Sequence, residues 1–131
     1  MGDVFSVEKR SWVMSRIRSK NTKIEVTMKE LFTRNKIEFE MHPKITGMPD
    51  FLVGKNTLVF CDGDFWHGYD YKKGKIPKQK FWREKIERNM KRDKKIGRKL
   101  RREGWSVIRL WEHDISKRSD YCMRKVLRSI G

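Results

Sequence analysis

A predicted β-hairpin in the middle of the chain constrains the fold most. Two runs rich in β-branched and aromatic residues, Asp50–Val53 and Thr57–Asp62, flank the turn residues Gly54-Lys55-Asn56. Short runs of this kind around a glycine-containing turn are typical of a hairpin. With a three-residue loop, Val53 lies opposite Thr57. This pairing determines which side chains share a face of the hairpin.

Elements on both sides of the hairpin predict a sheet covered by helices. Thr22-Lys23-Ile24-Glu25 has the capping-box pattern, so a helix is expected from Thr22 to about Asn35. Alternating apolar and charged residues predict a strand at Ile37–Met41. This order predicts an α/β or α+β fold, with a basic arm over residues 1–20 and one domain over residues 21–131. The later predicted elements are a basic loop at Tyr69–Lys80, a long helix at Phe81–Arg102, a strand at Trp105–Trp111 and a helix at Asp120–Ile130.

Positive charge is the strongest compositional signal. The 131 residues include 33 Lys and Arg against 17 Asp and Glu, a net charge of +16, and most of the excess lies between Lys72 and Arg102. A concentrated positive surface fits a polyphosphate partner, because neutralised phosphates release condensed counterions. We therefore expect a nucleic-acid partner. A solvated basic helix face is the alternative.

Localisation signals and cysteine usage favour a cytoplasmic protein. No apolar run is long enough for a transmembrane helix, and the first residues do not have the pattern of a secretory signal. Cys61 and Cys122 are too few for a disulfide framework.

Two carboxylates of the hairpin are candidates for a metal site. Side-chain alternation puts Asp50 and Asp62 on the same face as diagonal neighbours. Carboxylates this close repel each other unless a cation lies between them, and Mg²⁺ prefers oxygen ligands. A main-chain carbonyl near Cys61 could add a further ligand. The alternative is a turn-capping Asp50 and a solvated Asp62.

Three further acid–base candidates lie outside the hairpin. His67 follows the second hairpin strand and could take a proton from water, although an ordinary surface histidine is the alternative. Asp93 falls on the inward stripe of the long basic helix, where it could orient a histidine or form a salt bridge with an arginine. Glu25 is the last residue of the capping box, but it could also reach toward the sheet.

Aromatic residues suggest a way of distorting DNA. Phe65 and Trp66 are adjacent on a predicted loop, and Trp82 begins the basic helix. Bulky aromatics on a loop can cover a core, or they can enter a base step and unstack it. Both readings remain open at this point.

Five segments of the chain, in this order and spacing, resemble the very-short-patch repair endonuclease family. The resemblance implies an α/β fold with a restriction-endonuclease-like core, a single-domain variant of the PD-(D/E)XK fold with a mixed sheet flanked by helices. The usual lysine of that motif is absent, as in a family where histidine takes over its role. The segments are Met14–Glu25, Gly47–Val53, Val59–Gly68, Phe81–Asp93 and Gly104–Glu112.

The resemblance also implies roles for the catalytic candidates. Asp50 matches the central Mg²⁺ carboxylate, and the carbonyl of Cys61 matches a main-chain metal ligand. Asp62 stands where some members have histidine. His67 matches the catalytic histidine, and Asp93 matches the aspartate that polarises it.

The resemblance extends to residues that would contact DNA. Phe65, Trp66 and Trp82 match aromatics that intercalate at the mismatch, and Met14 matches an arm residue that helps to wedge the duplex. Glu25 matches an acidic residue linked to the active site. Basic residues of the long helix are expected to bind the DNA backbone, among them Lys85, Arg88 and Lys91.

One departure from the family concerns structural zinc. Members of the family carry a zinc ion bound by cysteines and a histidine, and the matching positions here are Asp64, Tyr69, Tyr71 and His113. Tetrahedral zinc needs four good ligands, and only His113 is one. We therefore expect no structural zinc.

These inferences predict a monomeric, Mg²⁺-dependent endonuclease that nicks one strand of double-stranded DNA next to a mismatched T:G base pair. It would act in the cytoplasm, associated with the nucleoid. Two alternatives remain. One is a sequence-specific nicking endonuclease of a mobile element or restriction system, and the other is a non-catalytic DNA-binding module.

Overall fold

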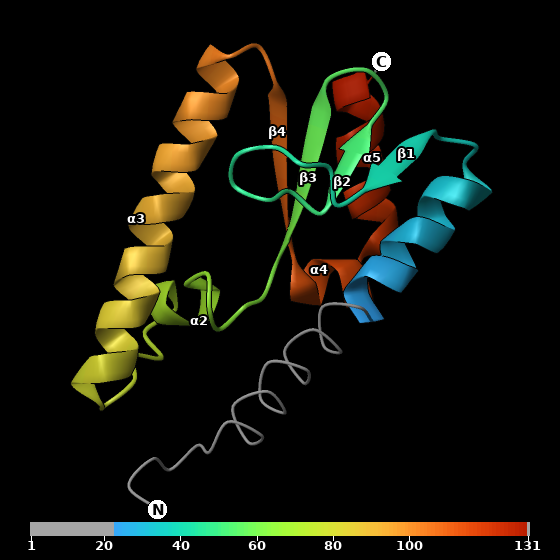
Figure 1. The fold of residues 1–131 in the computed structure, drawn as a ribbon. Coiled ribbons are helices and arrows are strands. Elements are labelled where there is room, and N and C mark those ends of the chain that lie inside the picture. Colours follow the sequence, from blue (N-terminus) through green and yellow to red (C-terminus); the bar gives the residue numbers. More distant parts are fainter. Residues whose placement is uncertain (1–22, 131) are drawn as a thin grey trace, which may run out of the picture.

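A four-stranded mixed sheet organises the chain (Figure 1). The computed structural model describes residues 23–130. Strands β1, β2 and β3 are antiparallel neighbours, whereas β3 and β4 run parallel. The strands, in their order across the sheet, are β1 (Phe39–Met41), β2 (Phe51–Val53), β3 (Thr57–Asp62) and β4 (Ser106–Trp111).

Helices cover both faces of this sheet. The helix over residues 23–34 and helix α5 (Ser119–Ile130) lie on one face, and the long helix α3 (Lys80–Arg102) lies on the other (Figure 1). Two short helices complete the fold. Helix α2 (Tyr69–Lys72) precedes α3, and α4 (Glu112–Lys117) joins β4 to α5.

Side-chain alternation along β3 builds two hydrophobic cores. Val59 faces the helix over residues 23–34 and α5, and it packs in the larger cluster with Met28 and Val126. Leu58 faces α3 and packs with Leu100 in the smaller cluster. This period of two is what a strand buried on both faces requires.

The predicted fold and hairpin register are confirmed, with small shifts at the element ends. Val53 pairs with Thr57, as expected. The first strand begins at Phe39 rather than Ile37, because the Ile37 amide donates to the Phe32 carbonyl at 2.9 Å and so still belongs to the end of the preceding helix. The other predicted elements are present, with their described ends shifted by at most one residue.

Two short helices were not predicted. Helix α2 lies inside the segment 69–80 that was predicted as a loop, and α4 lies directly after β4. Both have six residues or fewer, too short for helical periodicity to be visible in the sequence. The basic arm over residues 1–20, Met14 and the capping residue Thr22 lie outside the described residues.

No helix in the described part of the chain is both long and apolar enough to span a membrane.

Candidate active site

A cleft of about 430 Å³ lies where β3 ends, between the sheet and α3. Its walls come from the loop before β2, the end of β3, α3 and β4. Four residues predicted from the sequence line it: Asp50, Asp62, His67 and Asp93. Arg109 of β4 lines it as well. The fold thus brings together carboxylates and an imidazole from segments far apart in the chain.

The turn after β3 positions His67. The Asn89 side-chain amide of α3 donates to the Trp66 carbonyl at 3.1 Å and ties the turn to the helix. Gly68 has a φ of 91°, and a Cβ there would lie 2.5 Å from Met90 Sδ. The left-handed φ favours glycine here, and any larger residue would also displace the Met90 side chain.

His67 belongs to a network of charged groups in the cleft. Its Nδ1 lies 2.6 Å from Asp93 Oδ2 and 3.8 Å from Asp62 Oδ1. Arg109 Nη1 donates to both carboxylate oxygens of Asp62, at 3.0 and 3.1 Å. Arg109 Nη2 lies 3.7 Å from Asp93 Oδ1, and its guanidinium covers the Phe60 ring at 4.2 Å. One arginine therefore connects two carboxylates that face the same histidine.

These contacts shift the pKa values of the three titrating groups. Burial alone would lower the pKa of His67, but the hydrogen bond to Asp93 and the nearby carboxylates raise it above its ordinary value. Burial works against ionisation of Asp93, yet the bond to His67 and the charge of Arg109 lower its pKa. Burial raises the pKa of Asp62 in spite of Arg109. Asp93 is therefore the carboxylate best able to stabilise a charged imidazole.

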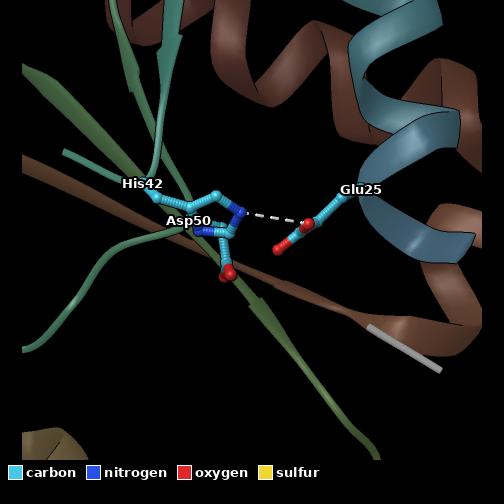
Figure 2. A group of neighbouring side chains, drawn as sticks. All are labelled: Glu25, His42 and Asp50. Atoms are coloured by element: carbon cyan, nitrogen blue, oxygen red, sulfur yellow. Dashed lines mark hydrogen bonds and ion pairs between the residues drawn. The ribbon is translucent and has the colours of Figure 1, made fainter. Parts of the chain in front are cut away.

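A second cluster contains Glu25, His42 and Asp50 (Figure 2). The side chains come from the helix over residues 23–34, the segment after β1 and the residue before β2. His42 Nε2 lies 3.2 Å from Glu25 Oε2. Asp50 Oδ2 accepts the Cys61 amide at 2.6 Å. Glu25 is buried and directed at this cluster, whereas its predicted capping partner Thr22 lies outside the described residues.

The cluster has the donors that a divalent metal requires. One ligand atom from each of the three residues lies within 4.8 Å of the other two. Burial raises the pKa of Asp50 to about 6, with the Cys61 amide acting in the opposite direction and the Glu25 carboxylate raising it further. A cation would relieve this repulsion, since it favours the ionised carboxylates. The residues present therefore fit a metal ion.

The structure divides the predicted metal ligands between two clusters, whereas the sequence-based prediction placed them at one ion. Asp50 and Asp62 were expected to share one ion, but Asp62 groups with His67 and Asp93 and is bound by Arg109. The Cys61 thiol belongs to neither cluster of candidate ligand atoms among the described residues, and burial raises its pKa well above the ordinary value. Its main-chain carbonyl remains a predicted ligand.

The predicted aromatic residues lie in one row. The Phe65 and Trp66 ring centroids are 4.8 Å apart, and those of Trp66 and Trp82 are 5.6 Å apart. Phe81, which is 61% exposed, extends the row with a centroid 4.9 Å from that of Trp82. The Lys85 ammonium lies 5.1 Å from the Trp66 ring centroid. The row therefore combines stacking surfaces with a positive charge.

The basic residues of α3 are spread over the exposed side of the helix. Arg88 and Lys91 are exposed, whereas Lys85 is half-buried against the aromatic row. The buried residues Ile86 and Leu100 mark the opposite side. The helix thus presents positive charge to solvent along its length.

The four positions matched to zinc ligands contact neighbouring side chains. His113 Nδ1 lies 2.8 Å from Asp64 Oδ1, and the Tyr69 ring lies over His113 with centroids 4.2 Å apart. The Tyr71 hydroxyl donates to Glu87 of α3 at 2.5 Å. These contacts connect the segment after β3 to α4 and to α3.

Two residues of the site were missed by sequence reasoning. Arg109 is the one charged residue within the apolar run Val107–Trp111, and a charge inside a strand is a signal that could have identified it. His42 has no comparable signal, because its role depends on the approach of Glu25 from a different element.

Comparisons with known proteins identify the family of the chain. Residues 2–73 match the family model described as DNA mismatch endonuclease Vsr. The type II nicking enzyme V.NmeDIP of Neisseria meningitidis serogroup C is 35% identical, with 98% of this chain and 90% of the relative covered. DNA mismatch endonuclease Vsr of Escherichia coli (strain K12) is 34% identical, with 86% of this chain and 74% of the relative covered. The chain therefore belongs to the Vsr family of DNA mismatch endonucleases, and it is a DNA endonuclease.

Proposed function

We propose that the protein is a Mg²⁺-dependent endonuclease that nicks one strand of double-stranded DNA next to a mismatched T:G base pair. The observation that carries the proposal is the 2.6 Å contact between His67 and Asp93, in the same cleft as the carboxylate of Asp50. A histidine oriented by an aspartate, beside carboxylates that can hold a metal, suits hydrolysis of a phosphodiester.

Glu25 and Asp50 would hold the ion, with the Cys61 carbonyl as a further ligand. Both carboxylates belong to the cluster whose donor atoms converge, and Mg²⁺ prefers oxygen ligands. When bound, the ion would supply Lewis-acid polarisation of the scissile phosphate. Asp62 is bound to Arg109 and would position its neighbours.

His67 would act as the general base. When its Nδ1 donates to Asp93, Nε2 is left to accept a proton from the attacking water. Asp93 fixes the ring orientation and stabilises the imidazolium that forms. Arg109 helps the hydrogen bond from His67 to lower the pKa of Asp93, and its charge would attract the DNA phosphate into the cleft.

The basic face of α3 would bind the DNA backbone. Contacts from Lys85, Arg88 and Lys91 would neutralise phosphates, so affinity should fall as salt rises. Met14, which lies outside the described residues, would help to wedge the duplex.

The aromatic row would enter the duplex at the mispair. Phe65, Trp66 and Trp82 offer stacking surfaces to the unstacked bases. Unstacking costs less at a mispair than at a Watson–Crick pair, which gives selectivity without reading every base.

A second candidate function is nicking at a fixed sequence in fully paired DNA. It is favoured by the names of relatives such as V.NmeDIP and V.XorIIP of Xanthomonas oryzae pv. oryzae (strain KACC10331 / KXO85), which are called type II nicking enzymes. A non-catalytic DNA-binding module is less compatible with the chain, because it has no need for paired His67 and Asp93. For either nicking activity, we expect a monomer that works on nucleoid DNA in the cytoplasm.

The test uses end-labelled duplexes that differ only in one central base pair, T:G or T:A, with Mg²⁺ and with chelator. We expect a single nick near the T of the mispair, none in the T:A control, and none with chelator. Equal nicking of both duplexes would favour the second candidate. The Asp50→Ala variant should bind the duplex without nicking it; nicking at the wild-type rate would contradict the metal assignment.

A further inference from the structure

We propose that His42 is a third ligand of the metal centre formed by Glu25 and Asp50, and that its imidazole makes the site prefer ions such as Mn²⁺ and Co²⁺ to Mg²⁺. The inference rests on the metal dependence in the proposed function. It adds a nitrogen donor that neither composition nor motif spacing indicated.

The backbone brings His42 next to Asp50. The His42 amide donates to the Asp50 carbonyl at 2.9 Å, so the two side chains leave the main chain at neighbouring points. His42 Nε2 lies 3.2 Å from Glu25 Oε2 (Figure 2). The three donor atoms thus come together from three separate parts of the chain, all within 4.8 Å of one another.

The charge balance distinguishes this cluster from the one around His67. Within residues 23–130, no lysine or arginine lies within ion-pair distance of Glu25 or Asp50. In the other cluster, Arg109 already compensates Asp62. Among the described residues, these two carboxylates therefore lack a lysine or arginine partner, which favours a divalent ion. Arg109 makes such an ion unnecessary in the cluster around His67.

The donor types set the metal preference. Mg²⁺ selects oxygen ligands and dehydrates reluctantly, whereas first-row transition ions also bind imidazole well. His42 is 59% exposed at its side chain, so it can move onto an ion from the solvent side without disturbing the core. Removing it should therefore weaken Mn²⁺ and Co²⁺ binding more than Mg²⁺ binding.

Two substitutions of His42 distinguish metal ligation from a hydrogen bond to Glu25. His42 has a φ of 50°, in the left-handed region where asparagine is well tolerated, so His42→Asn preserves the backbone conformation. His42→Gln retains a hydrogen-bond donor able to reach Glu25. Lys44→Gln, an exposed change in the same loop, is the matched control.

The experiment measures binding of Mn²⁺ by electron paramagnetic resonance and of Co²⁺ by its visible absorption, with Mg²⁺ as competitor, on the full chain at neutral pH. We expect both His42 variants to lose about tenfold or more in Mn²⁺ affinity and to change the Co²⁺ spectrum, with Lys44→Gln unchanged. If both variants keep the wild-type Mn²⁺ affinity and Co²⁺ spectrum, His42 is not a ligand. If His42→Gln alone keeps them, His42 only orients Glu25 by a hydrogen bond, and the assignment is also overturned.

The outcomes also separate this inference from the proposed function. Asp50→Asn should abolish both metal binding and nicking. If wild-type protein nicks without any divalent ion but the His42 variants lose Co²⁺ binding, the metal-dependent function fails and the His42 site stands. If nicking needs metal while the His42 variants bind it normally, the function stands and the His42 assignment fails.

Discussion

Arg109 and Asp62 form an ion pair between neighbouring parallel strands. Arg109 Nη1 lies 3.0 Å from Asp62 Oδ1 and 3.1 Å from Oδ2. Asp62 is only 4% exposed, so water cannot replace the guanidinium as its partner. The pair connects the end of β3 to the network around His67.

Arg109→Leu should lower the free energy of unfolding by about 3 kcal/mol, because the buried Asp62 carboxylate loses the guanidinium that donates to both its oxygens. Nicking should fall as well, since the network around His67 loses the guanidinium that lies beside Asp93 and lowers its pKa. Urea denaturation measures the first effect. As a control, Arg124→Leu removes an ion pair with exposed Asp120 and should leave unfolding nearly unchanged. Adding Asp62→Asn to Arg109→Leu should recover stability; purely additive losses would contradict the pairing.

Asp93→Asn should reduce the nicking rate by about a hundredfold or more, because the imidazolium loses its stabilising carboxylate. The pH profile should also change. His67 accepts a proton only when neutral, so activity rises with pH through its pKa, which Asp93 raises above the ordinary value. Without this carboxylate the pKa falls, and the rising limb should move to lower pH. A profile that keeps its position would show that His67 is not the titrating base.

Trp66→Ala should weaken discrimination between T:G and T:A duplexes more than it weakens general DNA affinity. Stacking on an aromatic ring contributes about 1–3 kcal/mol per base, and this contribution is available only where bases unstack. Fluorescence anisotropy with matched duplexes measures both affinities. Leu127→Ala, an exposed apolar residue on α5, serves as control and should change neither. Equal losses for both duplexes would assign Trp66 to general packing.

His113→Ala should lower the free energy of unfolding by about 1 kcal/mol, because it removes the Asp64 contact and the Tyr69 ring contact. In the Asp50→Asn variant, which lacks the metal centre proposed at Glu25, His42 and Asp50, the melting temperature should stay the same in chelator and gain nothing from zinc, since the loop is held by direct contacts. A melting temperature that falls in chelator and returns with zinc, but not with Mg²⁺, would contradict this prediction.

The sequence predicted the parts of the fold that depend on local periodicity. The hairpin register followed from two β-rich runs and a three-residue turn, and the observed Val53–Thr57 pair agrees with it. The inward position of Asp93 followed from its spacing to Ile86 on the long helix. Asp93 was predicted either to contact a histidine or to form a salt bridge with an arginine. It does both, because it contacts His67 and also lies near Arg109.

Contacts between distant segments could not be predicted in the same way. Periodicity places a side chain on a face, but it does not say which residue of another element will face it. Asp62 and Arg109 are 47 positions apart, and they meet only because β4 lies parallel to β3 in a register that pairs Phe60 with Arg109. The sequence therefore assigned Asp62 to a metal that it would share with Asp50.

The sequence by itself determined the order of elements along the chain, the hairpin register, the basic helix and, through the collinear family segments, the DNA endonuclease activity. Tertiary structure decided how the charged groups are divided between two clusters. Glu25 meets His42 because a helix and a loop approach each other, and Asp62 meets Arg109 because two strands lie side by side. Charge pairing depends on distances of a few ångströms, and chain spacing does not determine such distances between separate elements.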